Sequence, residues 1–352
     1  MRRTDPLIVG GGPAGAAAAI VLAAGGARPL LLEKRREIGD SVCGGFLSWD
    51  ALASLQALGI DVDPLGARVI TEVRIIAGDR RVQAPLPRGA AGLSRATLDR
   101  ALLARAEAAG ARIERGVAAR TSTARIVRTA DGAELVAETL FLATGKHALR
   151  GLGREVSRPG AVGLRTSVAG TADLDGVIEL HLFRHGYAGL LLQEDGRANL
   201  SLSLSAGRLR EAGGVPALLD ELGREAPRLG ERLASAGAWE SIAAVPYGWL
   251  ARATTPGVFR LGDQAAVIAS VVGDGIGLAL ASGRSAAGAW SVGTASPRWQ
   301  RGFARRVAPA LRVAEGVRAV AERPPLATGA LWGLERMPGL ISLLARASRA
   351  GG

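Results

Sequence analysis

The residues whose types and spacing could do chemistry begin near the start of the chain, where glycines follow a short apolar run. Gly10, Gly12 and Gly15 fill a G-x-G-x-x-G spacing between the apolar residues 7–9 and the alanine-rich stretch 16–24. Glycines at this spacing permit a tight strand-to-helix turn and let a diphosphate approach the backbone closely. The N-terminus of the following helix stabilises an anion through its free N–H groups and its dipole. In a chain with 49 glycines the spacing alone is a weak signal.

The context of these glycines strengthens the prediction. Alanine-rich helices pack closely on sheets, and residues 29–32 have the apolar character of a buried parallel strand. Glu33 ends that strand 18 positions after Gly15, where a carboxylate can bind the ribose hydroxyls of an adenine dinucleotide. We therefore predict a dinucleotide site; the alternative is a glycine and alanine turn with a purely structural role.

Further candidates lie later in the chain. An apolar run at 258–261 ends in Gly262-Asp263, and the glycine-rich turn 273–277 precedes a small-residue helix over 278–290. Ser94 is the expected N-cap of a helix that begins with Arg95. Alternation and turn signals over about 156–250 favour an antiparallel sheet. Five polar or aromatic side chains lie on this predicted sheet or on the strand returning from it: His181, His185, Tyr187, Tyr247 and Trp249. They could contact a substrate, and a histidine could act as acid or base. Residues of these types more often have a structural role.

Composition limits the classes of protein. The 352 residues can form two domains on one framework. A single cysteine, Cys43, excludes an internal disulfide, and we expect a cytoplasmic protein.

The net charge of +12 comes mostly from scattered arginines, which favours an anionic cofactor or substrate over nucleic acid. We expect no metal site and no spanning helix. The basic tail beyond 297 could cap the core or lie on a membrane surface, and we favour capping.

The order of three elements resembles a known superfamily. The glycine turn with Glu33, the Arg95 helix, and Gly262-Asp263 with its glycine turn follow one another as in the FAD-dependent oxidoreductases of the aromatic hydroxylase (group A flavin monooxygenase) and geranylgeranyl reductase superfamily. The resemblance covers roughly residues 5–295. It implies an α/β fold with a Rossmann-like FAD/NAD(P)-binding domain, an inserted antiparallel β-sheet substrate domain and a helical C-terminal segment. The implied boundaries are 1–75, 93–155 and 255–298 for FAD binding, 76–92 and 156–254 for substrate, and 299–352 for the tail.

The same resemblance implies residue roles. Asp263 binds a ribityl or phosphate-linked oxygen, Arg95 lies at the ribityl and phosphate region, and the amides of 273–277 face the pyrimidine ring of the flavin. The loop with Cys43 lies against the ring in the reductase branch. The expected cofactor contacts are Gly10, Gly12, Pro13, Ala14, Gly15, Glu33, Lys34, Cys43, Gly44, Gly45, Arg95, Gly145, Gly262, Asp263, Gly273, Gly275 and Ile276; the catalytic candidates are Cys43, His185 and Tyr187.

Three departures from the superfamily pattern matter. Gly145-Lys146-His147 stands where hydroxylases carry an Asp-Gly pair, which leaves their mode of NAD(P)H binding in doubt. No proline lies between Gly262 and Gly273. Gly189 and Leu192 occupy the places of the tryptophan and proline of the reductase and halogenase branches, and the missing tryptophans argue against halogenation.

We expect an FAD-dependent monooxygenase that uses NAD(P)H to hydroxylate an aromatic or polyketide-like molecule. The alternative, favoured by the Cys43 loop and the missing Asp-Gly pair, is a geranylgeranyl-reductase-like enzyme that reduces C=C bonds of an isoprenoid or lipid. A non-catalytic dinucleotide-binding protein is the alternative from another class.

Overall fold

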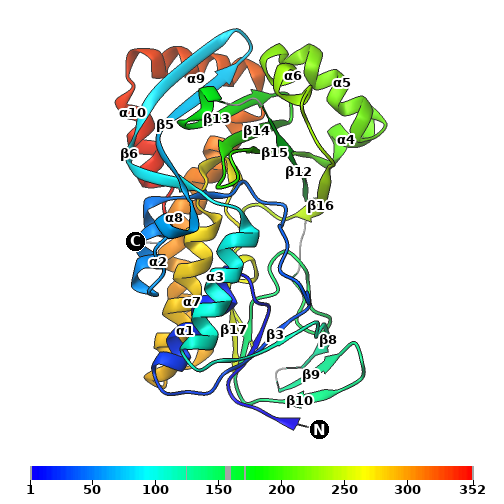
Figure 1. Cartoon of the computed structure of the whole chain (residues 1–352), viewed down its shortest axis with the longest axis vertical. Helices are drawn as coiled ribbons and strands as arrows, with labels where there is room; N and C mark the ends of the chain where they lie inside the picture. Colours follow the sequence, from blue (N-terminus) through cyan, green and yellow to red (C-terminus); the bar gives the residue numbers. More distant parts are fainter. Residues whose placement is uncertain (1, 124, 155–159, 170–171, 351–352) are drawn as a thin grey trace.

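The structure, a computed structural model, describes residues 2–123, 125–154, 160–169 and 172–350. Figure 1 shows two sheet-containing parts stacked along the long axis, with the C-terminal helices running from one part to the other. The predicted boundary between 155 and 156 lies outside the described residues, and the division into domains stays a proposal.

A five-stranded parallel sheet forms the core of the first part. Its order is β17-β11-β2-β3-β7, and its central strands are apolar and buried because helices cover them. In a parallel sheet the carboxyl ends of the strands share one edge, so the segments that follow β2, β3, β11 and β17 meet there. The strands are β2 (Leu7–Val9), β3 (Leu30–Glu33), β7 (Arg112–Arg115), β11 (Leu140–Leu142) and β17 (Val258–Arg260).

Both faces of this sheet are covered. Helices α1 (Pro13–Ala24), α3 (Arg95–Ala108) and α7 (Gly275–Ser291) pack together on one face. Alanines of α1 allow a close approach to α7, where a Cβ at Gly283 would lie 2.1 Å from the carbonyl oxygen of Ala14. The other face packs against a small sheet of order β1-β10-β9-β8. Its strands are β1 (Arg2–Arg3), β8 (Ala119–Ser122), β9 (Ile126–Thr129) and β10 (Glu134–Val136).

An eight-stranded sheet forms the second part, in the order β16-β12-β15-β14-β13-β5-β6-β4. Its pairs are antiparallel except for β5 and β13, which run parallel. Its long strands begin at Arg68, earlier than the predicted boundary at 76, because β5 pairs along its length with β6 and β13. The strands are β4 (Phe46–Leu47), β5 (Arg68–Ala77), β6 (Arg80–Gly92), β12 (Ala161–Val168), β13 (Gly176–Phe183), β14 (Gly186–Leu192), β15 (Ala198–Ser205) and β16 (Glu240–Val245).

Helices cover parts of both faces of the larger sheet. Leucines of α5 (Val215–Glu225) and α6 (Pro227–Leu233) pack on one face. The short α4 (Ala206–Ala212) adjoins them, and α2 (Trp49–Ala57) lies beside α7. The opposite face contacts the C-terminal helices α9 (Pro324–Arg336) and α10 (Gly339–Ala347).

The described part of the C-terminal segment consists of three helices. The 26-residue α8 (Ser296–Ala321) packs on the nucleotide-binding core as the apolar spacing indicated. Pro324-Pro325 separate α8 from the next helix and begin α9, because proline is tolerated in the first turn of a helix. Among the described residues, no helix is long and apolar enough to cross a bilayer.

Candidate functional site

A cavity of about 1010 Å³ lies where the carboxyl edge of the parallel sheet meets the larger sheet and α8–α10. Most of its lining is apolar, and the charged side chains of Arg95, Lys146 and Asp263 lie at the end near the parallel sheet. Of the predicted cofactor contacts, Gly10, Gly15, Glu33 and Lys34 do not line it; the others do: Gly12, Pro13, Ala14, Cys43, Gly44, Gly45, Arg95, Gly145, Gly262, Asp263, Gly273, Gly275 and Ile276.

The glycine turn has the geometry that the spacing predicts. Gly10 has a φ of 108°, and a Cβ at Gly15 would lie 1.9 Å from the carbonyl oxygen of Gly10, so both positions require glycine for the fold. Gly12 is different: a Cβ there would point into the cavity, with Nη2 of Arg95 3.5 Å away. The turn therefore leaves room at Gly12 for a ligand group at the N-terminus of α1.

Glu33 is buried at the end of β3 and anchored by two amides. Its Oε2 accepts a hydrogen bond from the Gly11 amide at 2.7 Å, and Oε1 accepts one from the Arg35 amide at 2.8 Å. These bonds fix the carboxylate beside the glycine turn, where it still has lone pairs for ribose hydroxyls. Lys34 is exposed next to it.

Arg95 lies in the first turn of α3 and faces the same glycine turn. Ser94 caps that helix by accepting a hydrogen bond from the Thr97 amide at 3.1 Å. Asp99 holds the guanidinium with two hydrogen bonds, 2.9 Å from Nε and 2.6 Å from Nη2. Burial opposes the charge on Arg95, but Asp99 outweighs it, so the pKa of Arg95 lies above its ordinary value. The site thus keeps a fixed positive charge beside Gly12, suited to a diphosphate.

Asp263 follows β17, next to Gly262, where a Cβ would lie 3.1 Å from the Cβ of Ala14 at the start of α1. Among the described residues its half-buried carboxylate has no hydrogen-bond or ion-pair partner, although it lines the cavity. Arg154 donates to its carbonyl oxygen at 2.8 Å, and Gln264 donates to the carbonyl oxygens of Gly145 and His147. The segment that replaces the Asp-Gly pair is therefore tied to the Asp263 turn.

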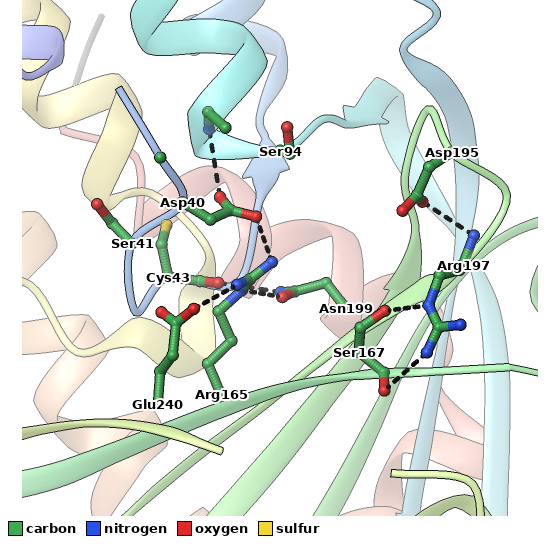
Figure 2. Close-up of polar contacts among 12 residues, drawn as sticks. Asp40, Ser41, Cys43, Ser94, Arg165, Ser167, Asp195, Arg197, Asn199 and Glu240 are labelled. Atoms are coloured by element: carbon green, nitrogen blue, oxygen red, sulfur yellow. Dashed lines mark hydrogen bonds and ion pairs between the residues drawn. The ribbon is translucent and has the colours of Figure 1, made fainter. Parts of the chain in front are cut away.

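The loop 39–45 is held in place by the larger sheet (Figure 2). Arg165 of β12 contacts the carboxylates of Asp40 and Glu240 and donates to the amide oxygen of Asn199 at 2.6 Å. Asn199 donates in turn to the carbonyl oxygens of Cys43 at 3.0 Å and Gly44 at 2.8 Å. Figure 2 shows Asp40 bound on its other side by an amide at the start of α3.

These contacts fix Cys43 where it lines the cavity, next to the guanidinium of Arg95. Lys146 adds a further contact to the loop, because its ammonium donates to the Val42 carbonyl oxygen at 3.3 Å. The sequence offered no signal for Arg165 and Asn199, because they lie more than 100 residues along the chain from the loop that they hold.

A cluster of hydroxyl groups lies on the substrate side of the cavity. Ser270 Oγ is 2.6 Å from the hydroxyl of Tyr187 and 2.7 Å from that of Tyr247, and Ser203 donates to Tyr247 at 3.2 Å. Burial, and then the neighbouring Tyr247, raise the pKa of Tyr187 well above its ordinary value, so its hydroxyl stays protonated. The sequence singled out both tyrosines but neither serine.

The two histidine candidates do not lie in the cavity. His185 is exposed in the turn between β13 and β14, with a φ of 61°. His181 is buried on the opposite face of β13, where its Nε2 lies 2.9 Å from Glu179. Alternation along the strand places Leu180 and Leu182 toward the cavity instead. The structure gives no support to the predicted catalytic role of His185.

The glycine turn before α7 also lines the cavity. Gly273 has a φ of 66°, and Gly275 has open space where a Cβ would project. Asp274 is fully buried and accepts from Ser48 at 2.9 Å and from the Ala350 amide at 2.8 Å. Burial raises the pKa of Asp274, and Arg349, 3.4 Å away, opposes that shift. No side chain among the described residues caps the N-terminus of α7, so its first backbone amides can bind a ligand. Arg349 and Ala350, which follow α10, hold the turn through Asp274.

These features fit FAD. The open space at Gly12 and Gly275, the fixed cation Arg95 and the unpartnered carboxylate of Asp263 lie along one cavity. Two helix N-termini, of α1 and α7, reach the same cavity with the polarity that a diphosphate and an electron-rich ring require.

Comparisons with known proteins support FAD as the cofactor. Residues 3–148 match the family model described as FAD binding domain. No curated protein matches the sequence. Pseudomonas aeruginosa PqsL, described as a probable FAD-dependent monooxygenase, matches with a TM-score of 0.74 at 19% identity over 94% of this chain and 100% of that one. A geranylgeranyl bacteriochlorophyll reductase-like protein from Thermoplasma acidophilum matches with a TM-score of 0.77 at 22% identity, covering 97% of this chain and 92% of that one.

Residues 3–148 of the chain therefore form an FAD-binding domain, and the chain has the same fold as PqsL and the geranylgeranyl bacteriochlorophyll reductase-like protein. It is an FAD-dependent oxidoreductase.

Proposed function

We propose that this flavoenzyme is an NAD(P)H-dependent monooxygenase that hydroxylates a largely apolar molecule carrying an electron-rich ring. The observation that carries the proposal is the joint position of an apolar cavity wall and of the Tyr187–Ser270–Tyr247 hydroxyls beside the α7 turn. Such a wall excludes water, and the hydroxyls can orient one polar group of a substrate. PqsL, described as a probable FAD-dependent monooxygenase, supports the proposal by its fold.

Bound FAD would supply the redox chemistry, taking a hydride from NAD(P)H and activating oxygen for transfer of one atom to the substrate. Gly12, Arg95, Glu33 and Asp263 would bind its diphosphate, ribose and ribityl groups. The free amides at the start of α7 would stabilise negative charge on the ring. Tyr187, kept protonated by burial, would donate a hydrogen bond to the substrate.

Reduction of an alkene is the second candidate function. Cys43 lines the cavity in a loop held by Arg165 and Asn199, and that loop corresponds to the one expected against the flavin ring in the reductase branch.

The proposal includes a cytoplasmic location, inferred from the single cysteine.

Oxygen labelling tests the proposal. The enzyme is reduced anaerobically with NADH or NADPH and then mixed with ¹⁸O₂ and a panel of phenols, aminoaromatics and polycyclic ketones. We expect a product that carries one ¹⁸O atom and reoxidation with little peroxide. Complete conversion of oxygen to peroxide with every compound, together with anaerobic reduction of a polyprenyl alkene, would establish the reductase instead.

A further inference from the structure

Most apolar side chains that remain exposed gather on the last two helices. Among the described residues, six of the eight exposed large hydrophobic side chains lie within 326–344. Leu340, Leu343 and Leu344 are 36%, 61% and 42% exposed, and their spacing places them on one side of α10. The remaining three are Leu326, Trp332 and Met337. We call Leu340, Leu343 and Leu344 the α10 stripe.

The cavity reaches the surface at this stripe. All three leucines line the 1010 Å³ cavity while they remain exposed to solvent. An apolar molecule bound outside the α10 stripe could therefore enter the cavity along an apolar path. Val292, exposed to 79%, has no such connection, because it does not line the cavity.

A basic hollow adjoins the α10 stripe. It has a volume of about 390 Å³ and is lined by four arginines and one acid, Asp50. Three of the arginines, Arg88, Arg306 and Arg346, are exposed and have no ion-pair partner among the described residues. Arg349, the fourth, lines the hollow and the large cavity alike. We call this group the arginine hollow.

The charge of the whole segment agrees with the hollow. Residues 323–350 contain four arginines and one acid, Glu335, and Glu335 is 3.0 Å from Arg80. A second copy of this chain, with its own net charge of +12, would be repelled from such a face. Exposed leucines beside unpaired arginines instead match a partner that offers hydrocarbon next to phosphate.

We propose that the α10 stripe and the arginine hollow dock on the surface of a bilayer that contains anionic phospholipids. The leucines enter the boundary between headgroups and acyl chains, and the three exposed arginines of the hollow contact lipid phosphates. The cavity then opens toward the hydrocarbon. If the proposed function holds, its apolar substrate enters from the membrane. This route of substrate entry rests on the proposed function, whereas docking on the membrane does not.

Vesicle binding tests the docking surface without any assay of activity. FAD-loaded protein is sedimented with phosphatidylcholine vesicles, with or without phosphatidylglycerol, at low and at physiological ionic strength. The variants Leu343→Glu and Arg346→Glu change the docking face. Their matched controls are Val292→Glu, at a 79% exposed apolar position, and Arg228→Glu, at an exposed arginine of α6.

We expect binding to anionic vesicles, a loss of about tenfold or more in partitioning for each docking-face variant, and little change for each control. Equal weakening by Arg228→Glu and Arg346→Glu would overturn the proposal, because net charge alone would then explain binding. So would a protein that stays in the supernatant at low ionic strength. Self-association lost in Leu343→Glu, without vesicle binding, would assign the face to a second copy instead.

Discussion

At the scale of single residues, Gly12 separates binding of the cofactor from folding. Gly10 has a backbone conformation that favours glycine, and Gly15 has no room for a Cβ. A Cβ at Gly12, in contrast, would meet nothing closer than Arg95 at 3.5 Å. We predict that Gly12→Val folds and loses FAD, because its side chain fills the space expected for the diphosphate. Flavin absorbance after gel filtration, with circular dichroism as the check of folding, measures both. A folded variant that retains FAD would contradict the site.

Glu33 is the second residue with a separable role. Glu33→Gln keeps the shape of the side chain and the acceptor oxygen toward the Gly11 amide, but removes the charge and the acceptor that faces the Arg35 amide. We predict FAD affinity lower by about 1.5–3 kcal/mol, the range for a hydrogen bond to a charged group. Fluorescence titration of the apoprotein with FAD measures it, and unchanged affinity would place the ribose elsewhere.

At the scale of elements, a buried ionic cluster joins α6 to the larger sheet. Glu179 of β13 lies 2.7 Å from Arg74 of β5 and 3.1 Å from Arg232 of α6, and also contacts His181. Burial alone would raise the pKa of Glu179, but hydrogen bonds from His181, Arg74 and Arg232 hold it well below its ordinary range. The cluster therefore stabilises the fold at neutral pH.

A lowered carboxyl pKa gives a defined pH dependence. The stabilisation by Glu179 is complete above its ordinary pKa of 4.5 and is lost as the pH falls from there toward the lowered pKa. Glu179→Gln should reduce the free energy of unfolding at pH 7 by about 3 kcal/mol, the low end for a broken buried pair, because Asp173 still pairs with both arginines.

Urea unfolding of both proteins between pH 7 and pH 3 measures this prediction. The difference between them should shrink below about pH 4.5. A difference that is constant with pH would show that Glu179 acts by packing alone.

The elements also show what the sequence could predict. The glycine turns, Glu33, the Ser94 cap and the parallel strands follow from local spacing, because each depends on neighbours within a few residues. Arg165 and Asn199 depend on the pairing of β12 with β15 and on a loop more than 100 residues away. Local patterns do not encode such contacts. The start of α9 at Pro324 is likewise not encoded locally, because a proline pair favours a break unless tertiary packing uses it as the first turn of a helix.

At the scale of the whole molecule, Arg165 links the two parts of the chain. It reaches from the larger sheet to Asp40, which accepts from the Ala96 amide at the start of α3. We predict that Arg165→Met loosens the loop 39–45, with amide hydrogen exchange there at least about tenfold faster, because half-buried Asp40 and buried Asn199 lose the donor that Arg165 supplies. The matched control is Arg128→Met, which removes an ion pair with Glu134 in which the arginine is 65% exposed. Equal exchange in both variants would contradict the linking role.

The arrangement of the whole chain serves one cavity, whose cofactor end, apolar wall and hydroxyl cluster come from different parts of the fold. The measurement that tests this account most directly is the flavin content of the purified protein. After reconstitution with FAD and removal of excess, we predict a yellow protein with close to one FAD per chain, identified by its mass after release. A folded protein that stays colourless and shows no FAD after the same treatment would contradict the account.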